Sequence, residues 1–67
     1  MDIVSECLKI QRKHHKLTQQ QVADYLHIHR STYAYYETGK TDPPLSTIIA
    51  LTSLYHVSAD YLLGIKK

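Results

Sequence analysis

Residues 17–40 of this chain, LTQQQVADYLHIHRSTYAYYETGK, decide its fold, because they hold two apolar stripes of helical spacing in close succession. In the first stripe Val22, Ala23 and Leu26 lie three and four positions apart, so they share one face of a helix. Thr18 is suited to cap this helix, since its hydroxyl can accept a backbone N–H of the first turn. The stretch therefore begins with a short amphipathic helix.

A second helix follows almost at once. Tyr33 and Tyr36 lie three positions apart behind the polar run 29–32, and Gly39 is suited to end the helix in a left-handed conformation. Only residues 26–28 connect the two stripes. A connection this short makes the helices cross steeply and share one core, so the spacing predicts a helix-turn-helix motif.

Three further helices are expected around this pair, and no segment has the pattern of a strand. One helix spans about residues 2–15, with Asp2 as its N-cap. Two prolines then interrupt the chain, and helices follow over about 45–55 and 58–63, the second capped by Ser58 and ended by Gly64. Further side chains expected inside are Ile3, Val4, Cys7, Leu8, Leu45, Ile48, Leu51, Thr52 and Tyr55, with Tyr25 and Tyr61 as additional bulky packing residues.

Length and composition limit the class of protein. The 67 residues make a single domain, 1–67, with a core over 2–64 and a short tail over 65–67. A net charge of +2 permits nucleic-acid binding without demanding it. The single cysteine cannot form an internal disulfide, acidic residues stand where a signal peptide needs a basic start, and no run approaches membrane-spanning length. These features predict a cytoplasmic protein.

Three blocks, in this order, resemble the phage repressor and Cro family of helix-turn-helix proteins, the XRE family: LTQQQVA at 17–23, STYAYYETGK at 31–40 and VSADYLLG at 57–64. The resemblance implies a compact all-α fold of five helices, the lambda-repressor-like DNA-binding domain, with the helix-turn-helix in the second and third helices. It also implies that the third helix enters the major groove of double-stranded DNA and that the protein binds as a homodimer.

The resemblance further implies which side chains contact bases. Arg30, Ser31 and Tyr35 match outward positions of the recognition helix, and His29 is expected to lie beside Arg30 on the same surface. Arg30 can donate two hydrogen bonds to guanine, while the Ser31 hydroxyl can donate or accept. Tyr35 is suited to a thymine methyl, a sugar edge or a phosphate, and these alternatives stay open.

Phosphate contacts are implied on either side of the recognition helix. Gln19 and the neighbouring Thr18 match the start of the second helix, where side chains and free backbone N–H groups can bind a phosphate. Thr38, Lys40 and Thr41 match the backbone-binding segment after the recognition helix. Such contacts anchor the protein without selecting a sequence.

Other residues bear on stability. The resemblance implies an ion pair between Arg12 and Glu37 that fixes the recognition helix against the first helix. His27 and His56 stand where the family usually has glycine or asparagine, and Lys16 stands at a third such position. Because these sites can need a positive φ, which His adopts less easily than glycine, we expect strained turns and modest stability.

Each assignment has a plainer alternative. Any of these polar residues taken alone is a solvated surface residue, and their common placement on one edge of the motif is what favours contact with DNA. The five histidines lack the spacing of a metal site, so neither a metal nor another cofactor is expected. No paired carboxylates, activated nucleophile or phosphate-binding loop are present, so we expect no enzyme and no small-molecule substrate.

The leading interpretation is a sequence-specific DNA-binding transcriptional regulator, a repressor that binds a palindromic operator as a homodimer. The chain ends three residues beyond LLG, so the dimer contact is expected within the domain, with Leu62, Leu63 and Ile65 as candidates. Whether the chain is a complete small repressor or an N-terminal domain stays open. The alternative is an adaptor or antitoxin-type module that binds a partner protein, whose affinity should depend far less on salt.

Overall fold

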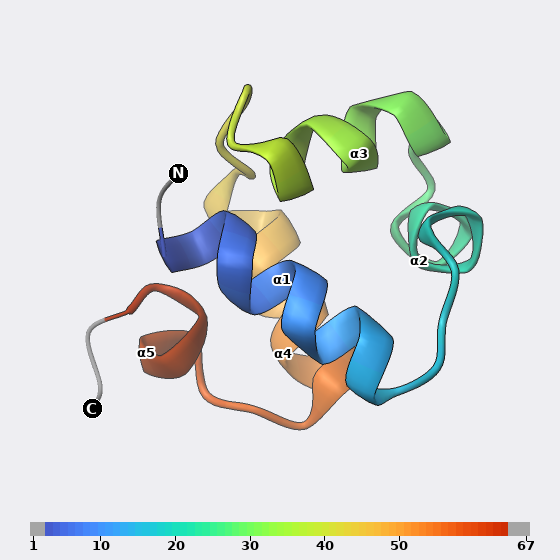
Figure 1. Ribbon diagram of the computed structural model, residues 1–67. Coiled ribbons are helices and arrows are strands. Elements are labelled where there is room, and N and C mark those ends of the chain that lie inside the picture. The colour runs from blue at the N-terminus through green and yellow to red at the C-terminus, as the bar shows by residue number, and fades with distance from the viewer. Residues whose placement is uncertain (1–2, 65–67) are drawn as a thin grey trace.

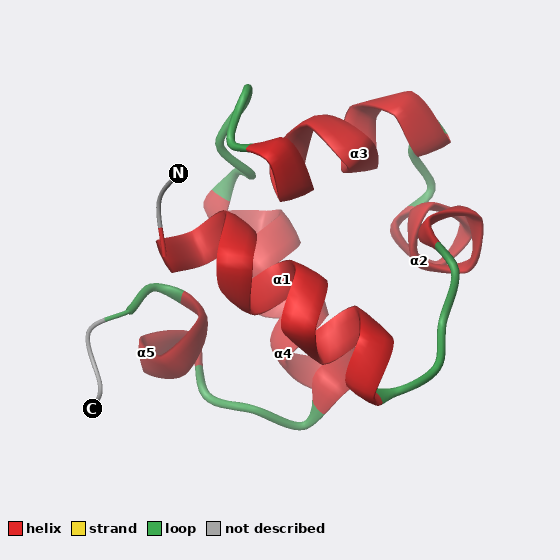
Figure 2. Cartoon of the chain, in the orientation of Figure 1, coloured by secondary structure: helices red, strands yellow, loops and turns green. Residues whose placement is uncertain are grey.

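The computed structural model describes residues 3–64, and these fold into five helices without a strand (Figures 1 and 2). The helices are α1 (Ile3–His14), α2 (Gln19–Leu26), α3 (Arg30–Thr38), α4 (Leu45–Tyr55) and α5 (Ala59–Leu62). Their order and bounds match the sequence-based expectation closely, so the predicted all-α fold is confirmed. The expected N-cap Asp2 lies outside the described residues.

The helices surround one core (Figure 1). α1 packs against α3 and α5, α4 packs against α5, and α2 packs chiefly against α3. No helix within the described range is long and apolar enough to cross a membrane. Every helix contributes to the buried apolar cluster, which consists of Cys7, Leu8, Val22, Ala23, Tyr33, Tyr36, Ile48, Leu51, Tyr55 and Leu62.

Side-chain caps fix where two helices begin. The Thr18 hydroxyl accepts the backbone N–H of Gln21, and the Gln21 side chain accepts the backbone N–H of Thr18 in return. Such a capping box stabilises a helix start by about 1 kcal/mol. The Ser58 hydroxyl accepts the backbone N–H of Tyr61 in the same way. Both predicted caps are therefore confirmed.

Left-handed residues fix where helices end. Gly39 ends α3 at φ 79°, while His27 ends α2 at φ 59° and His56 ends α4 at φ 56°. Lys16, before α2, also has a positive φ of 59°. Lys16, His27 and His56, which stand where the resemblance implies glycine or asparagine, thus all have a left-handed backbone. That conformation costs a residue with a Cβ roughly 1–2 kcal/mol. The expectation of strained turns is confirmed.

Three apolar residues expected in the core are exposed instead. Tyr25 is 46% exposed, because α2 packs chiefly against α3 and its fully buried stripe consists of Val22 and Ala23 alone. Ile3 is 58% exposed and Leu45 is 66% exposed. These two are the first residues of α1 and α4, where a helix begins at the rim of the core. For these three residues the burial predicted from helical spacing is therefore wrong.

Two other expected core residues are only half-buried. The Thr52 hydroxyl donates to the backbone oxygen of Ile49 at 2.5 Å, so it turns back onto its own helix. The Tyr61 hydroxyl accepts a hydrogen bond from the Gln11 amide at 3.3 Å, which links α1 to α5. The contact between α1 and α5 at this point is therefore polar.

The predicted dimer contact needs correction at one residue. Leu62 is completely buried in the core, so it is unable to contribute to a contact between two copies. Leu63 beside it is 39% exposed. The third candidate, Ile65, lies outside the described residues.

Candidate nucleic-acid interface

α3 has two chemically different faces. Its inner face buries Tyr33, Tyr36 and Glu37, whereas Arg30 and Tyr35 on the outer face are exposed. The division arises because residues three and four apart along a helix point the same way. The predicted recognition helix therefore presents Arg30 and Tyr35 to solvent, while Tyr33 and Tyr36 hold it to the core.

The N-terminal end of α3 carries the residues expected to contact bases first. Arg30 and Ser31 form its exposed first turn. His29 precedes them in an extended conformation, and its side chain makes no capping hydrogen bond to the helix. Because the first backbone N–H groups of a helix lack partners within it, this end favours an anion.

The inner face is anchored by an ion pair. The Glu37 side chain is 2% exposed, and its Oε2 accepts a hydrogen bond from Arg12 Nε at 2.6 Å. Arg12 Nη2 donates to Glu37 Oε1 at 3.1 Å, and Arg12 Nη1 donates to the backbone oxygen of Leu17 at 2.9 Å. The expected pairing of Arg12 with Glu37 is thus present, and it joins α1, the loop before α2, and α3.

The surroundings keep this buried carboxyl ionised. Burial alone would raise the pKa of Glu37, but hydrogen bonds from three side chains outweigh burial and hold this pKa below its ordinary value of 4.5. Their donors are Arg12, Tyr33 and Gln19. The hydrogen bond to Glu37 in turn raises the pKa of Arg12, although burial opposes the change. Glu37 is therefore a fixed negative charge at neutral pH.

A buried tyrosine pair lies beside the carboxylate. The hydroxyls of Tyr33 and Tyr55 are 3.5 Å apart. Burial raises the pKa of both phenols, and the hydrogen bond from Tyr33 to Glu37 raises that of Tyr33 further. The two tyrosines hence stay neutral and can donate. Helical spacing placed them in the core, but it gave no sign of their polar role.

Gln19 connects the buried ion pair to the outer face. It is the first residue of α2 and is half-buried. Its Nε2 donates to Glu37 Oε1 at 3.2 Å, and its Oε1 accepts from Arg30 Nη1 at 3.3 Å. The structure therefore joins a residue expected to bind phosphate directly to one expected to contact a base. Nothing in the sequence pattern indicates this link.

A second group of predicted residues gathers at the far end of α3. The Lys40 ammonium lies 4.6 Å from the centre of the Tyr35 ring, within range of a cation–π contact. The Thr38 hydroxyl and the backbone N–H groups of Lys40 and Thr41 all donate to the backbone oxygen of Tyr35. All four residues are exposed. Tyr35 consequently lies with the expected phosphate-binding residues, about 8 Å along the helix from Arg30.

These two groups define the candidate interface: an N-terminal group of Thr18, Gln19, His29, Arg30 and Ser31, and a C-terminal group of Tyr35, Thr38, Lys40 and Thr41. The Arg and Lys side chains supply positive charge, and the hydroxyls and amide supply hydrogen bonds.

Within the described residues, no three His, Cys, Asp or Glu side chains are arranged to hold a metal ion.

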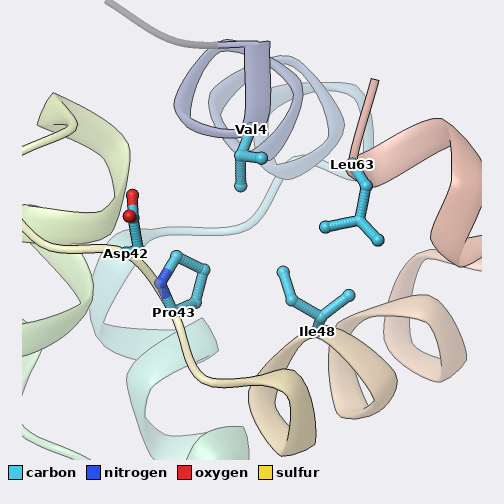
Figure 3. Close-up of a pocket in the computed structure, with 5 residues that line it drawn as sticks. All are labelled: Val4, Asp42, Pro43, Ile48 and Leu63. Carbon is cyan, nitrogen blue, oxygen red and sulfur yellow. The ribbon is translucent and has the colours of Figure 1, made fainter. Parts of the chain in front are cut away.

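A separate apolar surface lies where α1, α4 and the end of α5 meet. Figure 3 shows Val4, Ile48 and Leu63 converging on an open pocket of about 340 Å³, with Asp42 and Pro43 from the loop before α4 at its edge. The same helices expose Ile3, Leu45 and Ile49. We call this group of exposed and pocket-lining apolar residues the apolar face.

The sequence matches known proteins over most of its length. A helix-turn-helix family model matches residues 8–62. The chain is 49% identical over 59 residues to the uncharacterized HTH-type transcriptional regulator YqaE of Bacillus subtilis, covering 88% of this chain and 51% of that protein. It is 46% identical over 54 residues to the uncharacterized regulator YobD of the same organism, covering 81% of this chain and 48% of that protein.

Two further matches agree with these. The HTH-type transcriptional regulator ImmR of B. subtilis is 40% identical over 57 residues, covering 85% of this chain and 45% of that protein. The crystal structure of a transcriptional regulator from Listeria innocua matches with a TM-score of 0.89 at 34% identity, covering 96% of this chain and 60% of that chain. The chain spans about half the length of the curated relatives it matches. The resemblance inferred from the three sequence blocks is confirmed.

Proposed function

This chain belongs to the helix-turn-helix family, and we propose that it is a sequence-specific DNA-binding transcriptional regulator without enzymatic activity, acting in the cytoplasm. The observation that carries the proposal is the division of α3, which buries Tyr33, Tyr36 and Glu37 and leaves a polar face toward solvent. The names of the relatives, which are transcriptional regulators, support it.

In the proposed complex α3 lies in the major groove, which is wide enough to admit a helix. Arg30 donates to guanine O6 and N7, because its hydrogen bond to Gln19 uses only one N–H of the guanidinium. Ser31 contacts a neighbouring base, and His29 lies beside them. Tyr35, held against Lys40, contacts a thymine methyl or a sugar edge at the other end of the helix.

Phosphates on either side of the groove are bound by the remaining residues. Thr18 and the N-terminal turn of α2 contact one strand, and Thr38, Lys40 and Thr41 contact the other. Thr38, Lys40 and Thr41 are suited to this, since they are exposed and the backbone at Tyr35 fixes their position. These contacts supply affinity for any sequence.

We propose further that the protein binds a palindromic operator as a homodimer and represses transcription by excluding RNA polymerase. Since Leu62 is buried, the apolar face supplies the contact between copies, through exposed residues such as Leu45 and Leu63. Apolar side chains that a monomer leaves in water favour association when a second copy covers them. A symmetric dimer then places two α3 helices on half-sites about one helical turn apart.

Selection of bound sequences from a random DNA pool tests the proposal. We expect enrichment of one site with two-fold symmetry. Affinity for that site should fall roughly 1,000-fold or more between about 50 and 200 mM salt if a dimer binds six or more phosphates. If no sequence is enriched, the proposal is wrong, and a salt-insensitive protein partner identifies the adaptor function instead.

A further inference from the structure

The turn that ends α3 folds Lys40 back onto Tyr35. Gly39 is left-handed at φ 79°, and the backbone N–H groups of Gly39 and Lys40 both donate to the backbone oxygen of Tyr35. The bond from Lys40, at 3.0 Å, is the one typical of a Schellman motif. That motif brings the residue after the glycine against the start of the last helical turn, where an apolar contact is common. In this chain the two residues that meet are a lysine and a tyrosine.

Their contact joins a positive charge to an aromatic face. Lys40 Nζ lies 4.6 Å from the centre of the Tyr35 ring, and a ring attracts a cation placed over its face within about 6 Å. Tyr35 is exposed on the outer face of α3. The ring therefore holds the ammonium on the side of α3 that faces the DNA in the proposed complex.

The ammonium in this position remains available to an anion. It has three N–H donors, and the ring covers only one side of it. Among residues 3–64 the one ion pair joins Arg12 to Glu37, so no carboxylate of the described chain neutralises Lys40. An exposed and uncompensated ammonium is suited to a phosphate oxygen of the DNA backbone.

We propose that the Tyr35 ring positions the Lys40 ammonium for a phosphate of the DNA backbone. This role rests on the proposed function and deepens it, because it makes Tyr35 act on affinity through a second residue. A free lysine side chain samples many rotamers and loses this freedom when it binds. A lysine already held against a ring loses less, so the same phosphate contact supplies more affinity.

A double-mutant cycle measures this coupling. Wild type, Tyr35→Leu, Lys40→Met and the double variant are titrated against the enriched DNA duplex and each of its single-base variants. Lys40→Met removes the charge and keeps an unbranched side chain. We expect Tyr35→Leu to weaken binding roughly two- to fivefold more when Lys40 is present than in the Lys40→Met background. This excess loss should be the same on every duplex, because a phosphate contact carries no sequence information. A direct contact of Tyr35 with a base is lost in both backgrounds and cancels from the difference.

Tyr35→Phe separates the positioning role from a structural one. Phenylalanine keeps the aromatic face, so most of the coupling to Lys40 should remain. Tyr25→Leu is the matched control, since Tyr25 is a tyrosine of α2 with similar exposure, and it should cause the same loss in both backgrounds. Thermal unfolding shows whether Tyr35→Leu is folded. If it is not, Tyr35→Gln replaces it, because glutamine is a good helix former.

Three results would overturn this role and leave the proposed function intact, because the enriched duplex is still bound. One is an equal loss from Tyr35→Leu in the two backgrounds. Another is an excess loss confined to a single base pair, and the third is a Tyr35→Phe variant that loses the coupling as fully as Tyr35→Leu. If wild type enriches no sequence, the proposed function is overturned and this role with it.

Discussion

The inner and outer faces of α3 are built under different constraints. On the inner face Tyr33, Tyr36 and Glu37 are at most 6% exposed, and each fits neighbours from other helices. On the outer face Tyr35 is 43% exposed, and Arg30 and Ser31 also face solvent. The inner face therefore determines where α3 lies, and the outer face can change its chemistry with little cost to the fold. Substitutions on the two faces should separate stability from sequence preference.

The largest effect is expected on the inner face, from Arg12→Ala. It leaves the Glu37 carboxylate buried without its ionic partner, which costs about 3–5 kcal/mol. That approaches the whole stability of a domain of this size, so folding and DNA binding should weaken together. Urea and thermal unfolding measure the loss. Lys13→Ala, at an exposed neighbour, is the control, and an unchanged melting temperature for Arg12→Ala would contradict the structural role of the pair.

Acid should lower the free energy of unfolding, because it protonates Glu37 on the inner face of α3. Its pKa lies below 4.5 in the folded protein, so in acid the unfolded chain takes up this proton more readily than the folded one. The stabilisation is complete above about pH 4.5 and is lost as pH falls through the folded-state pKa. Glu37→Gln should therefore be less stable at pH 7 and lose less stability in acid. An acid unfolding profile as steep as that of wild type would exclude Glu37 as the cause.

Helical spacing predicted burial correctly on the inner face of α3 and wrongly at the first residues of α1 and α4. Spacing alone placed Tyr33 and Tyr36 in the core. In the middle of this helix, the residues that share a face by helical spacing are also the ones that other helices cover. The same spacing failed for Ile3 and Leu45, the first residues of α1 and α4. Periodicity shows which side of a helix a residue lies on, but it does not show whether another helix covers that residue. The Arg12–Glu37 pair followed from the family resemblance, as the two residues are far apart in the sequence.

The hydrogen bond between Gln19 and Arg30 could not be predicted from the sequence, for a related reason. The two residues are 11 positions apart, and Gln19 and Glu37 are 18 positions apart. Their contact depends on the crossing of α2 and α3, which the turn at His27 sets. In the structure Gln19, which the family resemblance assigns to phosphate binding, contacts Glu37 and Arg30.

The turns at either end of α3 offer a smaller test. His27→Gly should raise the melting temperature slightly, because relief of roughly 1–2 kcal/mol of left-handed strain exceeds the entropy cost of glycine, about 0.5–1 kcal/mol. Gly39→Ala should lower it by a similar amount, since it introduces a Cβ at φ 79°. Differential scanning calorimetry measures both. A clear drop for His27→Gly would show that the histidine side chain stabilises the turn.

The smallest effect on stability is expected on the outer face. Arg30→Ala and Ser31→Ala remove exposed side chains, so the free energy of unfolding should change by about 0.5 kcal/mol or less. Chemical unfolding of both variants beside Arg12→Ala makes the comparison direct. A loss for Arg30→Ala as large as that for Arg12→Ala would mean that the two faces are not separable.

Base-resolved affinities of Arg30→Ala and Lys40→Ala test the central claim most directly, namely that the outer face of α3 contacts bases while the segment after it binds phosphate. Both variants and wild type are titrated against the enriched DNA site and each of its single-base variants. Arg30→Ala should lose about 1–3 kcal/mol of discrimination at one base pair, while Lys40→Ala should weaken all sequences alike and lower the salt slope by about one. A uniform loss for Arg30→Ala, with discrimination unchanged at every base pair, would contradict the account.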